Sequence, residues 1–285
     1  MIRFREIGFY TTIQDRGRFG FRHLGVPVAG ALDQVSFENS NLILGNPLNT
    51  AAFELTMLGP TIELLKRCCF CVTGADIEIY LNEEVVPMNT AVIAEKDSQL
   101  KIGRVKNGLR SYLNFKGGFS SEIKLDSASQ FSGITTENRV KAKSTYELKE
   151  DLTDLISEHK TNALIRSIEH SALIQLDVYK GVDFKLFPLK LIESLTETEF
   201  TIGSSVNRMA CQLNTNSKLA HTIDRLSSPT YIGAVQCTPS GKLLILMRDS
   251  QTTGGYPRLL QCTRNAVNRL SQIRPNQRLK FVLID

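Results

Sequence analysis

The sequence predicts a mainly β protein with a few short helices. Most apolar segments are short, rich in β-branched residues, and separated by turn-forming residues at intervals of roughly ten residues. Few segments have a helical period, and strands do not alternate with long helices as they do in βαβ units. A chain of 285 residues can form one large domain or two modest ones, and we expect β-rich units at 1–170 and 171–285.

The strands predicted by this pattern fall in both halves of the chain. They are 61–65, 70–73, 77–81, 99–102, 109–115, 200–203, 231–237, 243–247 and 279–284. The run Leu-Asn-Glu-Glu-Val at 81–85 is typical of a hairpin tip. The segment 120–149 is rich in Ser, Thr, Lys and Glu, so we expect a loop or a junction between the units there.

The strongest helical signal covers residues 34–44. Asp33 can cap its N-terminus, and Gly45 followed by Pro47 ends it. Two further short helices are predicted at 188–195 and 264–271, and the polar segment 151–160 is left open between helix and loop.

The composition argues against several classes of function. The net charge is +5, but the basic residues are scattered, which favours a solvated mixed-charge surface over a nucleic-acid patch. Trp is absent and aromatic residues make up 7% of the chain, so stacking platforms for single-stranded nucleic acid are not expected. The first residues lack a secretory signal, and no apolar run is long enough to span a bilayer. We therefore expect a cytoplasmic protein without membrane contact.

The cysteines favour a structural role. The six are Cys68, Cys69, Cys71, Cys211, Cys237 and Cys262. The first three lie in an apolar, strand-like run without C-x-x-C spacing, and the four histidines show no zinc-ligand spacing. Buried small hydrophobes are thus favoured over zinc ligands or disulfides, no metal is predicted, and free thiols fit a reducing cytoplasm.

The most site-like segment is Asp-Ser-Gln-Thr-Thr-Gly-Gly-Tyr-Pro at 249–257, directly after the apolar run 243–247. Polar residues on a loop held by a rigid strand are typical of a functional site. Asp249 is the best catalytic candidate, because a carboxylate at the end of a core strand can exchange a proton with an amide nitrogen. The alternative is a hydrogen-bonded β-turn without a catalytic role.

The rest of this loop offers groups for binding. Gln251, Thr252 and Thr253 can donate hydrogen bonds to an oxyanion or to a carboxylate substrate. Tyr256 can donate through its hydroxyl group or simply pack. Gln236 ends another apolar run and is expected to face the same pocket.

A second polar loop lies near the N-terminus. Gln14, Asp15, Arg16 and Arg18 stand in a glycine-punctuated stretch, in which Arg16 and Arg18 can hold an anion and Asp15 can orient a substrate amide. An Asx-type turn with exposed arginines is the alternative. His23 can act as a general base or be a structural residue. Arg208 can bind substrate or brace its loop.

Two further carboxylates have structural alternatives. Asp33 is better explained as a helix cap than as a catalytic group. Glu54 lies in a strand-like run and is either a paired structural carboxylate or a site residue.

Long ordered motifs at 11–33 and 249–257 carry a resemblance to a known family. Further matching blocks are Asn46-Pro47, Glu54, Gly59-Pro60, 73–75, 109–113, Gly117-Gly118, Arg208-Met209, 233–236 and Gln272. Over almost its whole length the chain resembles the allophanate hydrolase subunit 2 family, which is biotin-dependent carboxyltransferase-like. The family includes the C subunit of ATP-dependent 5-oxoprolinase, the KipA regulator and part of urea carboxylase.

The resemblance implies two β-barrel units of cyclophilin-like type and a component of a hydrolase that opens the lactam of 5-oxoproline. It implies partners similar to the A and B subunits of 5-oxoprolinase, and ATP used by the complex at a site not located on this chain. Gly241-Lys242 lacks the context of a phosphate-binding P-loop. The alternatives are a carboxyltransferase component with a separate biotin carrier, and a KipA-like regulator that binds a kinase inhibitor.

The middle of the chain departs from the family pattern. Residues 125–130 lack the glycine and arginine expected after Gly117-Gly118, and Ala210 replaces a glycine after Arg208-Met209. The segments 179–183 and 275–277 also differ. These departures leave open whether the activity or a partner-facing surface has changed.

Overall fold

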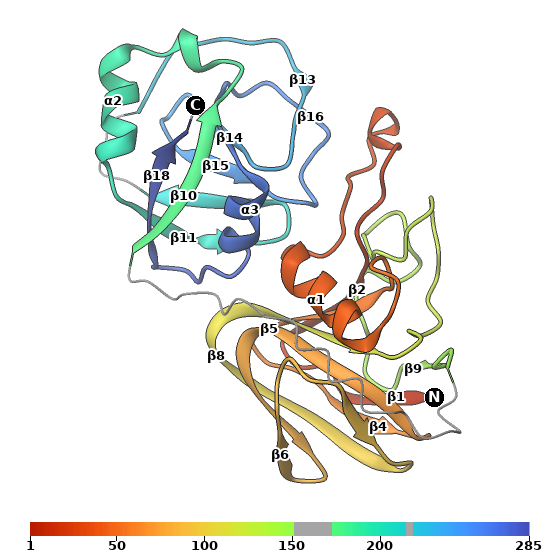
Figure 1. The fold of residues 1–285 in the computed structure, drawn as a ribbon. Helices are drawn as coiled ribbons and strands as arrows, with labels where there is room; N and C mark the ends of the chain where they lie inside the picture. The colour runs from red at the N-terminus through yellow and green to blue at the C-terminus, as the bar shows by residue number, and fades with distance from the viewer. Residues whose placement is uncertain (151–172, 215–218, 285) are drawn as a thin grey trace. The chain divides into compact units, whose positions relative to one another are not determined.

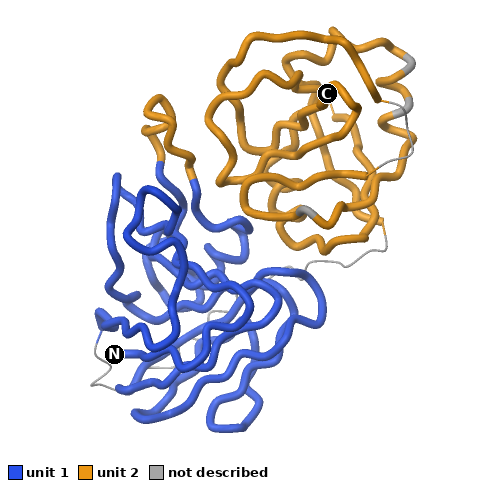
Figure 2. Tube along the Cα trace, turned by 180° about the vertical axis from the view of Figure 1, so that it is seen from behind, with its two compact units in different colours: residues 1–18, 29–168 blue, residues 19–28, 169–285 orange. Residues whose placement is uncertain are grey.

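The computed structural model describes residues 1–150, 173–214 and 219–284, and the chain divides into two compact units (Figure 2). Unit 1 comprises Met1–Arg18 and Ala29–Ile168, and unit 2 comprises Phe19–Val28 and Glu169–Asp285. The predicted boundary at residue 170 falls outside the described residues and stays a prediction. Nothing in the sequence indicates that Phe19–Val28 groups with the C-terminal unit.

Unit 1 is built on a curled nine-stranded sheet (Figure 1). Its strands are β1 (Ile2–Glu6), β2 (Tyr10–Gln14), β3 (Ala52–Thr56), β4 (Thr61–Leu64), β5 (Cys68–Leu81), β6 (Glu84–Val86), β7 (Val92–Ala94), β8 (Ser98–Phe115) and β9 (Thr145–Tyr146). They follow the order β2-β3-β8-β4-β1-β9, and β5 pairs with β6, β7 and β8. The predicted hairpin tip at 81–85 is confirmed, because Asn82 and Glu83, both at positive φ, connect β5 to β6.

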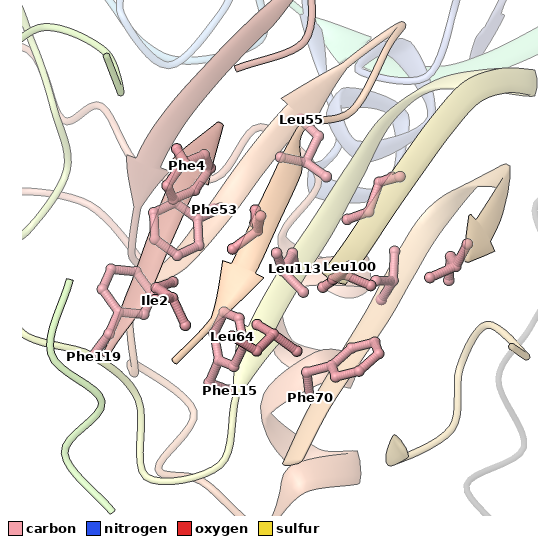
Figure 3. Close-up of a cluster of buried hydrophobic side chains, with 14 of the residues drawn as sticks. Ile2, Phe4, Phe53, Leu55, Leu64, Phe70, Leu100, Leu113, Phe115 and Phe119 are labelled. Carbon is pink, nitrogen blue, oxygen red and sulfur yellow. The ribbon is translucent and has the colours of Figure 1, made fainter. Parts of the chain in front are cut away.

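The burial of β5 explains how the core of unit 1 is layered. Residues 68–73 are buried on both faces, whereas residues 76–79 alternate between exposed and buried. Phe70 faces the main core, where Figure 3 shows it with Phe4, Phe53 and Phe119. Cys69 and Cys71 instead pack against Ile43 and Leu44 of helix α1 (Gln34–Leu44), which covers the other face. The cysteines therefore act as small core hydrophobes, as predicted.

Unit 2 contains a closed seven-stranded barrel (Figure 1). Its strands are β10 (Leu173–Lys180), β11 (Phe200–Val206), β12 (Ala210–Asn214), β14 (Ala234–Cys237), β15 (Leu243–Leu246), β17 (Arg258–Cys262) and β18 (Arg278–Leu283). The order is β10-β17-β14-β15-β12-β11-β18, and parallel pairing of β18 with β10 closes it. Two short strands, β13 (Ser228–Pro229) and β16 (Thr253–Gly254), form a separate ladder.

Helices are few in the described part of the chain, so the prediction of a mainly β protein is confirmed. Asp33 caps α1 by accepting a hydrogen bond from the Ser36 backbone N–H at 3.1 Å. Helices α2 (Leu189–Glu197) and α3 (Arg264–Leu270) lie where two short helices are predicted, and η1 (Arg22–Leu24) and η2 (Phe184–Leu186) are single 3₁₀ turns. The undecided segment 151–160 lies outside the described residues. Within the described ranges, no helix is long and apolar enough to cross a membrane.

Candidate functional site

The loop that follows β15 is anchored by a buried ion pair between Arg208 and Asp249. Arg208 Nε lies 2.8 Å from Asp249 Oδ2, and its Nη2 lies 2.9 Å from Oδ1. Both side chains are about nine-tenths buried, at 8% and 10% exposure. Antiparallel pairing of β12 with β15 brings the turn before β12 to the end of β15, where the Asp249 backbone N–H also donates to the Arg208 carbonyl. The loop therefore begins from a two-point, charge-assisted contact.

Two glutamines meet beneath the same loop. Gln236 on β14 is fully buried, and its Oε1 accepts a hydrogen bond from Gln251 Nε2 at 3.4 Å. Among the described residues, Gln236 Nε2 has no hydrogen-bond partner. A Cβ on Gly254 would lie 3.0 Å from that nitrogen, so the glycine keeps a small space open beside an unsatisfied donor.

A third contact comes from the segment Phe19–Val28. Arg22 Nη2 donates to the Thr230 carbonyl at 2.6 Å and to the Thr252 carbonyl at 3.3 Å. Thr230 in turn donates its backbone N–H to the Thr252 carbonyl and its hydroxyl to the Gln251 carbonyl. Burial lowers the pKa of Arg22 from its ordinary value, and the neighbouring Tyr231 opposes that shift. Arg22 and Thr230 thus fix the backbone of the loop that carries the predicted site.

The exposed groups of this loop differ from the buried ones. Gln251, Thr253 and Tyr256 are exposed and Thr252 is half-buried, whereas Ser250 is fully buried. His23 is exposed on the η1 turn. The loop therefore presents amide, hydroxyl and phenol groups above a buried layer formed by Arg208, Asp249 and Gln236.

Asp15, in unit 1, is the centre of a different network. Its Oδ1 accepts hydrogen bonds from the Ser127 and Ser129 hydroxyls at 2.7 and 2.6 Å and from the Gly17 backbone N–H at 2.8 Å. Its Oδ2 accepts from the Ala128 backbone N–H at 2.8 Å. The segment 125–130, which departs from the family pattern, therefore wraps around this carboxylate. Three of these four donors belong to residues 127–129, so the buried carboxylate holds this segment against the loop that contains Asp15.

Gln14 and Arg16 are also engaged within unit 1. Gln14 is fully buried, and its Oε1 accepts from the Gly30 backbone N–H at 3.1 Å. Arg16 Nε donates to Glu38 Oε1 at 2.9 Å. Both side chains thus make hydrogen bonds to other residues of unit 1. Their roles in substrate binding stay predictions.

Glu54 has the geometry of a paired structural carboxylate. It is 1% exposed, and its Oε2 accepts from the Leu32 backbone N–H at 2.8 Å and from the Tyr112 hydroxyl at 2.9 Å. Burial, followed by the charge of Glu54, raises the pKa of Tyr112 well above its ordinary value, so Tyr112 remains a donor.

The structure thus joins Arg208 with Asp249, and Gln236 with Gln251, within unit 2. Arg22 and Thr230 are partners of this loop that the sequence did not predict. Arg22 is next to His23, which the sequence predicts as a candidate site residue. No local sequence feature points to Thr230, because its role depends on the pairing of β13 with β16. Within the described residues, no group of three or more His, Cys, Asp or Glu side chains is placed to hold a metal ion.

The chain matches the model of a known family over most of its length. The chain belongs to the family described as carboxyltransferase domain, subdomains A and B, whose model matches residues 24–283. It is similar to the C subunit of 5-oxoprolinase from Haemophilus influenzae, with 32% identity over 99% of this chain and 90% of that protein. The C subunit of 5-oxoprolinase from Escherichia coli is 30% identical over 99% of this chain and 91% of that protein. The resemblance seen in the sequence is confirmed.

Part of the chain is also similar to urea amidolyase. The protein from Saccharomyces cerevisiae is 36% identical over 44% of this chain and 7% of its own length. The crystal structure of Kluyveromyces lactis urea amidolyase aligns with a TM-score of 0.91 at 21% identity, covering 100% of this chain and 19% of that one. Kluyveromyces lactis urea carboxylase gives the same TM-score and identity over 27% of its length. These structures support the mainly β fold.

Proposed function

We propose that this chain is one component of an ATP-dependent 5-oxoprolinase complex that hydrolyses the lactam of 5-oxoproline to glutamate. The observation that carries the proposal is the identity of 32% with a 5-oxoprolinase C subunit over nearly the whole of both chains. The partners are proteins similar to the A and B subunits of 5-oxoprolinase. Buried free thiols in the described residues are compatible with work in the cytoplasm.

The loop 249–257 supplies the chemistry in this proposal. Opening a lactam requires activation of its carbonyl and protonation of the departing amide nitrogen. Each Asp249 oxygen accepts from Arg208 and keeps a second lone pair, so the carboxylate can still take part in proton transfer. Arg208 orients that carboxylate. Gln251, Thr252, Thr253 and Tyr256 bind the carbonyl and carboxylate oxygens of the substrate, and Gln236 holds Gln251.

The N-terminal loop has a supporting part. The four hydrogen bonds to Asp15 favour a positioning role over direct catalysis, and the same holds for Gln14. We assign Arg16, whose guanidinium group is oriented by Glu38, to anion recognition, and His23 to proton exchange from the exposed η1 turn.

ATP use is assigned to the partner proteins. At Gly241-Lys242 the backbone N–H of Gly241 donates to the Thr238 carbonyl, and that of Lys242 donates to the Thr238 hydroxyl. Both donors are already used inside a hairpin, so this turn does not fit a phosphate group. None of the roles proposed for residues of this chain involves contact with ATP.

A carboxyltransferase component acting with a separate biotin carrier is the second candidate. The match of the carboxyltransferase domain family over residues 24–283 favours it. The same polar loop would then bind a carboxyl acceptor. The two candidates are separated by measuring transfer of a labelled carboxyl group from a biotinylated carrier that has been carboxylated beforehand with labelled bicarbonate, ATP and a biotin carboxylase.

The test is reconstitution with purified partners of the A and B types. We expect the three chains to co-elute on size exclusion and to release glutamate from 5-oxoproline only when ATP and all three chains are present. Separate elution at micromolar concentration, or equal glutamate release without this chain, would contradict the proposal.

A further inference from the structure

Unit 2 carries a cavity of about 380 Å³ that includes none of the predicted site residues. Its walls come from the end of β10, the turn that follows β10, strand β17 and Tyr231. Small-molecule sites in proteins begin at about 300 Å³, so the cavity is large enough for one small ligand.

The walls of this cavity are fixed before any ligand arrives. The Gly181 backbone N–H donates to the Leu259 carbonyl at 2.9 Å, and a Cβ on Gly181 would collide with the Arg258 carbonyl oxygen. Only glycine lets the turn after β10 lie this close to β17. Gln261 Nε2 donates to the Ile232 carbonyl at 2.8 Å, which fixes the segment that carries Tyr231. A preformed wall lowers the entropic cost of binding.

A charged network fixes the remaining wall. The Arg258 backbone N–H donates to Asp183 Oδ2 at 2.9 Å, and its Nη2 donates to the Ser228 hydroxyl at 3.0 Å. Arg258 Nε lies 3.4 Å from the same Asp183 oxygen, and Asp183 also pairs with Arg225. Since one carboxylate serves two guanidinium groups, the network has a net positive charge.

The lining has two kinds of chemistry. Tyr179 and Tyr231 are 45% and 57% exposed, so both aromatic rings are open to a ligand, and Leu260 adds an apolar surface. Lys180 and Arg258 are cationic, and no acidic side chain is among the described residues that line the cavity. The Lys180 ammonium lies 5.9 Å from the centre of the Phe184 ring, a contact that leaves its N–H groups available to an anion.

We propose that this cavity is a binding site for a small molecule with a flat, partly apolar ring and one anionic group such as a carboxylate. The ring packs against Tyr179 and Tyr231, and the anion lies near Lys180. The site does not depend on the proposed lactam chemistry. Tyr231, which lines the cavity, directly follows Thr230, whose backbone N–H donates to the Thr252 carbonyl. Thr230 therefore connects the wall of the cavity to the loop 249–257.

Calorimetry with 2-naphthoate and its neutral isostere 2-naphthamide tests the proposal on the full chain. We expect one naphthoate site per chain and weaker binding of the amide. Lys180→Met should weaken naphthoate about fivefold and leave the amide unchanged, since a solvent-exposed ion pair is worth no more than this. Tyr179→Ala should weaken both probes about tenfold, because it removes a stacking surface.

Lys185→Met is the matched control, because Lys185 is exposed on the adjacent η2 turn and does not line the cavity. It should leave both affinities unchanged, and thermal melts should show that every variant is folded. Tyr231→Phe keeps the ring and should retain binding. Equal binding of the two probes, no binding of either, or indifference to both Lys180→Met and Tyr179→Ala would overturn the proposal.

Discussion

Arg208 and Asp249 form a two-point ion pair, with Nε–Oδ2 and Nη2–Oδ1 distances of 2.8 and 2.9 Å. The pair is buried at the start of the loop 249–257, and removal of one member leaves the other charge without compensation. In the proposed function, stability and activity are therefore linked at this position. A substitution of Asp249 alone does not separate the proposed proton transfer from the structural role of the ion pair.

Asp249→Asn should lower the stability of unit 2 by about 3 kcal/mol, because the buried Arg208 guanidinium loses its counter-charge. The change in the free energy of unfolding is measured by denaturant titration, with a spectroscopic probe placed in unit 2. Asp224→Asn is the control, because Asp224 is an exposed carboxylate of the same unit. Equal stability of wild type and Asp249→Asn would show that the ion pair is not maintained in solution.

Arg22→Ala should loosen the loop 249–257. Arg22 donates to the Thr230 and Thr252 carbonyls, and hydrogen bonds from a charged group are among the stronger ones. Hydrogen exchange in the peptide that contains Thr252 should accelerate about tenfold. Arg264→Ala, on the exposed side of α3, should leave this peptide unchanged. Unaltered exchange in Arg22→Ala would show that the loop is held by other contacts.

Asp15→Asn should destabilise unit 1 by about 2 kcal/mol. An amide nitrogen in place of Oδ2 would face the Ala128 backbone N–H, and one in place of Oδ1 would face the Gly17 backbone N–H, so either orientation opposes two donors. Asp126→Asn is the matched control, since Asp126 is exposed and asparagine tolerates its positive φ. Hydrogen exchange across residues 125–130 distinguishes the two variants, and equal protection in both would refute the assigned role of Asp15.

The cysteines should resist alkylation in the folded protein. Burial raises the pKa of Cys69 and Cys237 to about 11 and that of Cys68, Cys71 and Cys262 to about 12. Below a raised pKa the thiol keeps its proton and reacts slowly, so iodoacetamide at neutral pH should label these positions only after unfolding in urea. Rapid labelling of Cys69 or Cys237 in the folded protein would contradict the burial described.

Local signals in the sequence predicted part of the fold. The helix 34–44 could be predicted because its caps, Asp33 and Gly45, are adjacent to it in the sequence, and both act as caps in the structure. The short strands could be predicted from their β-branched residues. The grouping of Phe19–Val28 with unit 2 could not be predicted, because it depends on contacts between residues about two hundred positions apart, such as Arg22 with Thr230.

The candidate site was predicted only in part, for the same reason. The loop 249–257 was visible as a run of polar residues after an apolar strand. The pairing of Arg208 with Asp249 depends on the alignment of β12 with β15, which no local pattern specifies. The segment 125–130 lacks the family's motif, yet its serines hold Asp15, because hydroxyl and backbone donors can serve a carboxylate from many sequences.

The most direct test of the central claim compares wild type with the double variant Arg208→Gln/Asp249→Asn in the reconstituted complex. The double variant replaces the ion pair with a neutral pair, so no unpaired charge remains buried and thermal melts should show a folded chain. ATP-dependent glutamate release from 5-oxoproline should then fall about a hundredfold or more, the scale expected when an acid–base group is lost. Turnover close to wild type in the folded double variant would contradict the claim that this loop carries the chemistry.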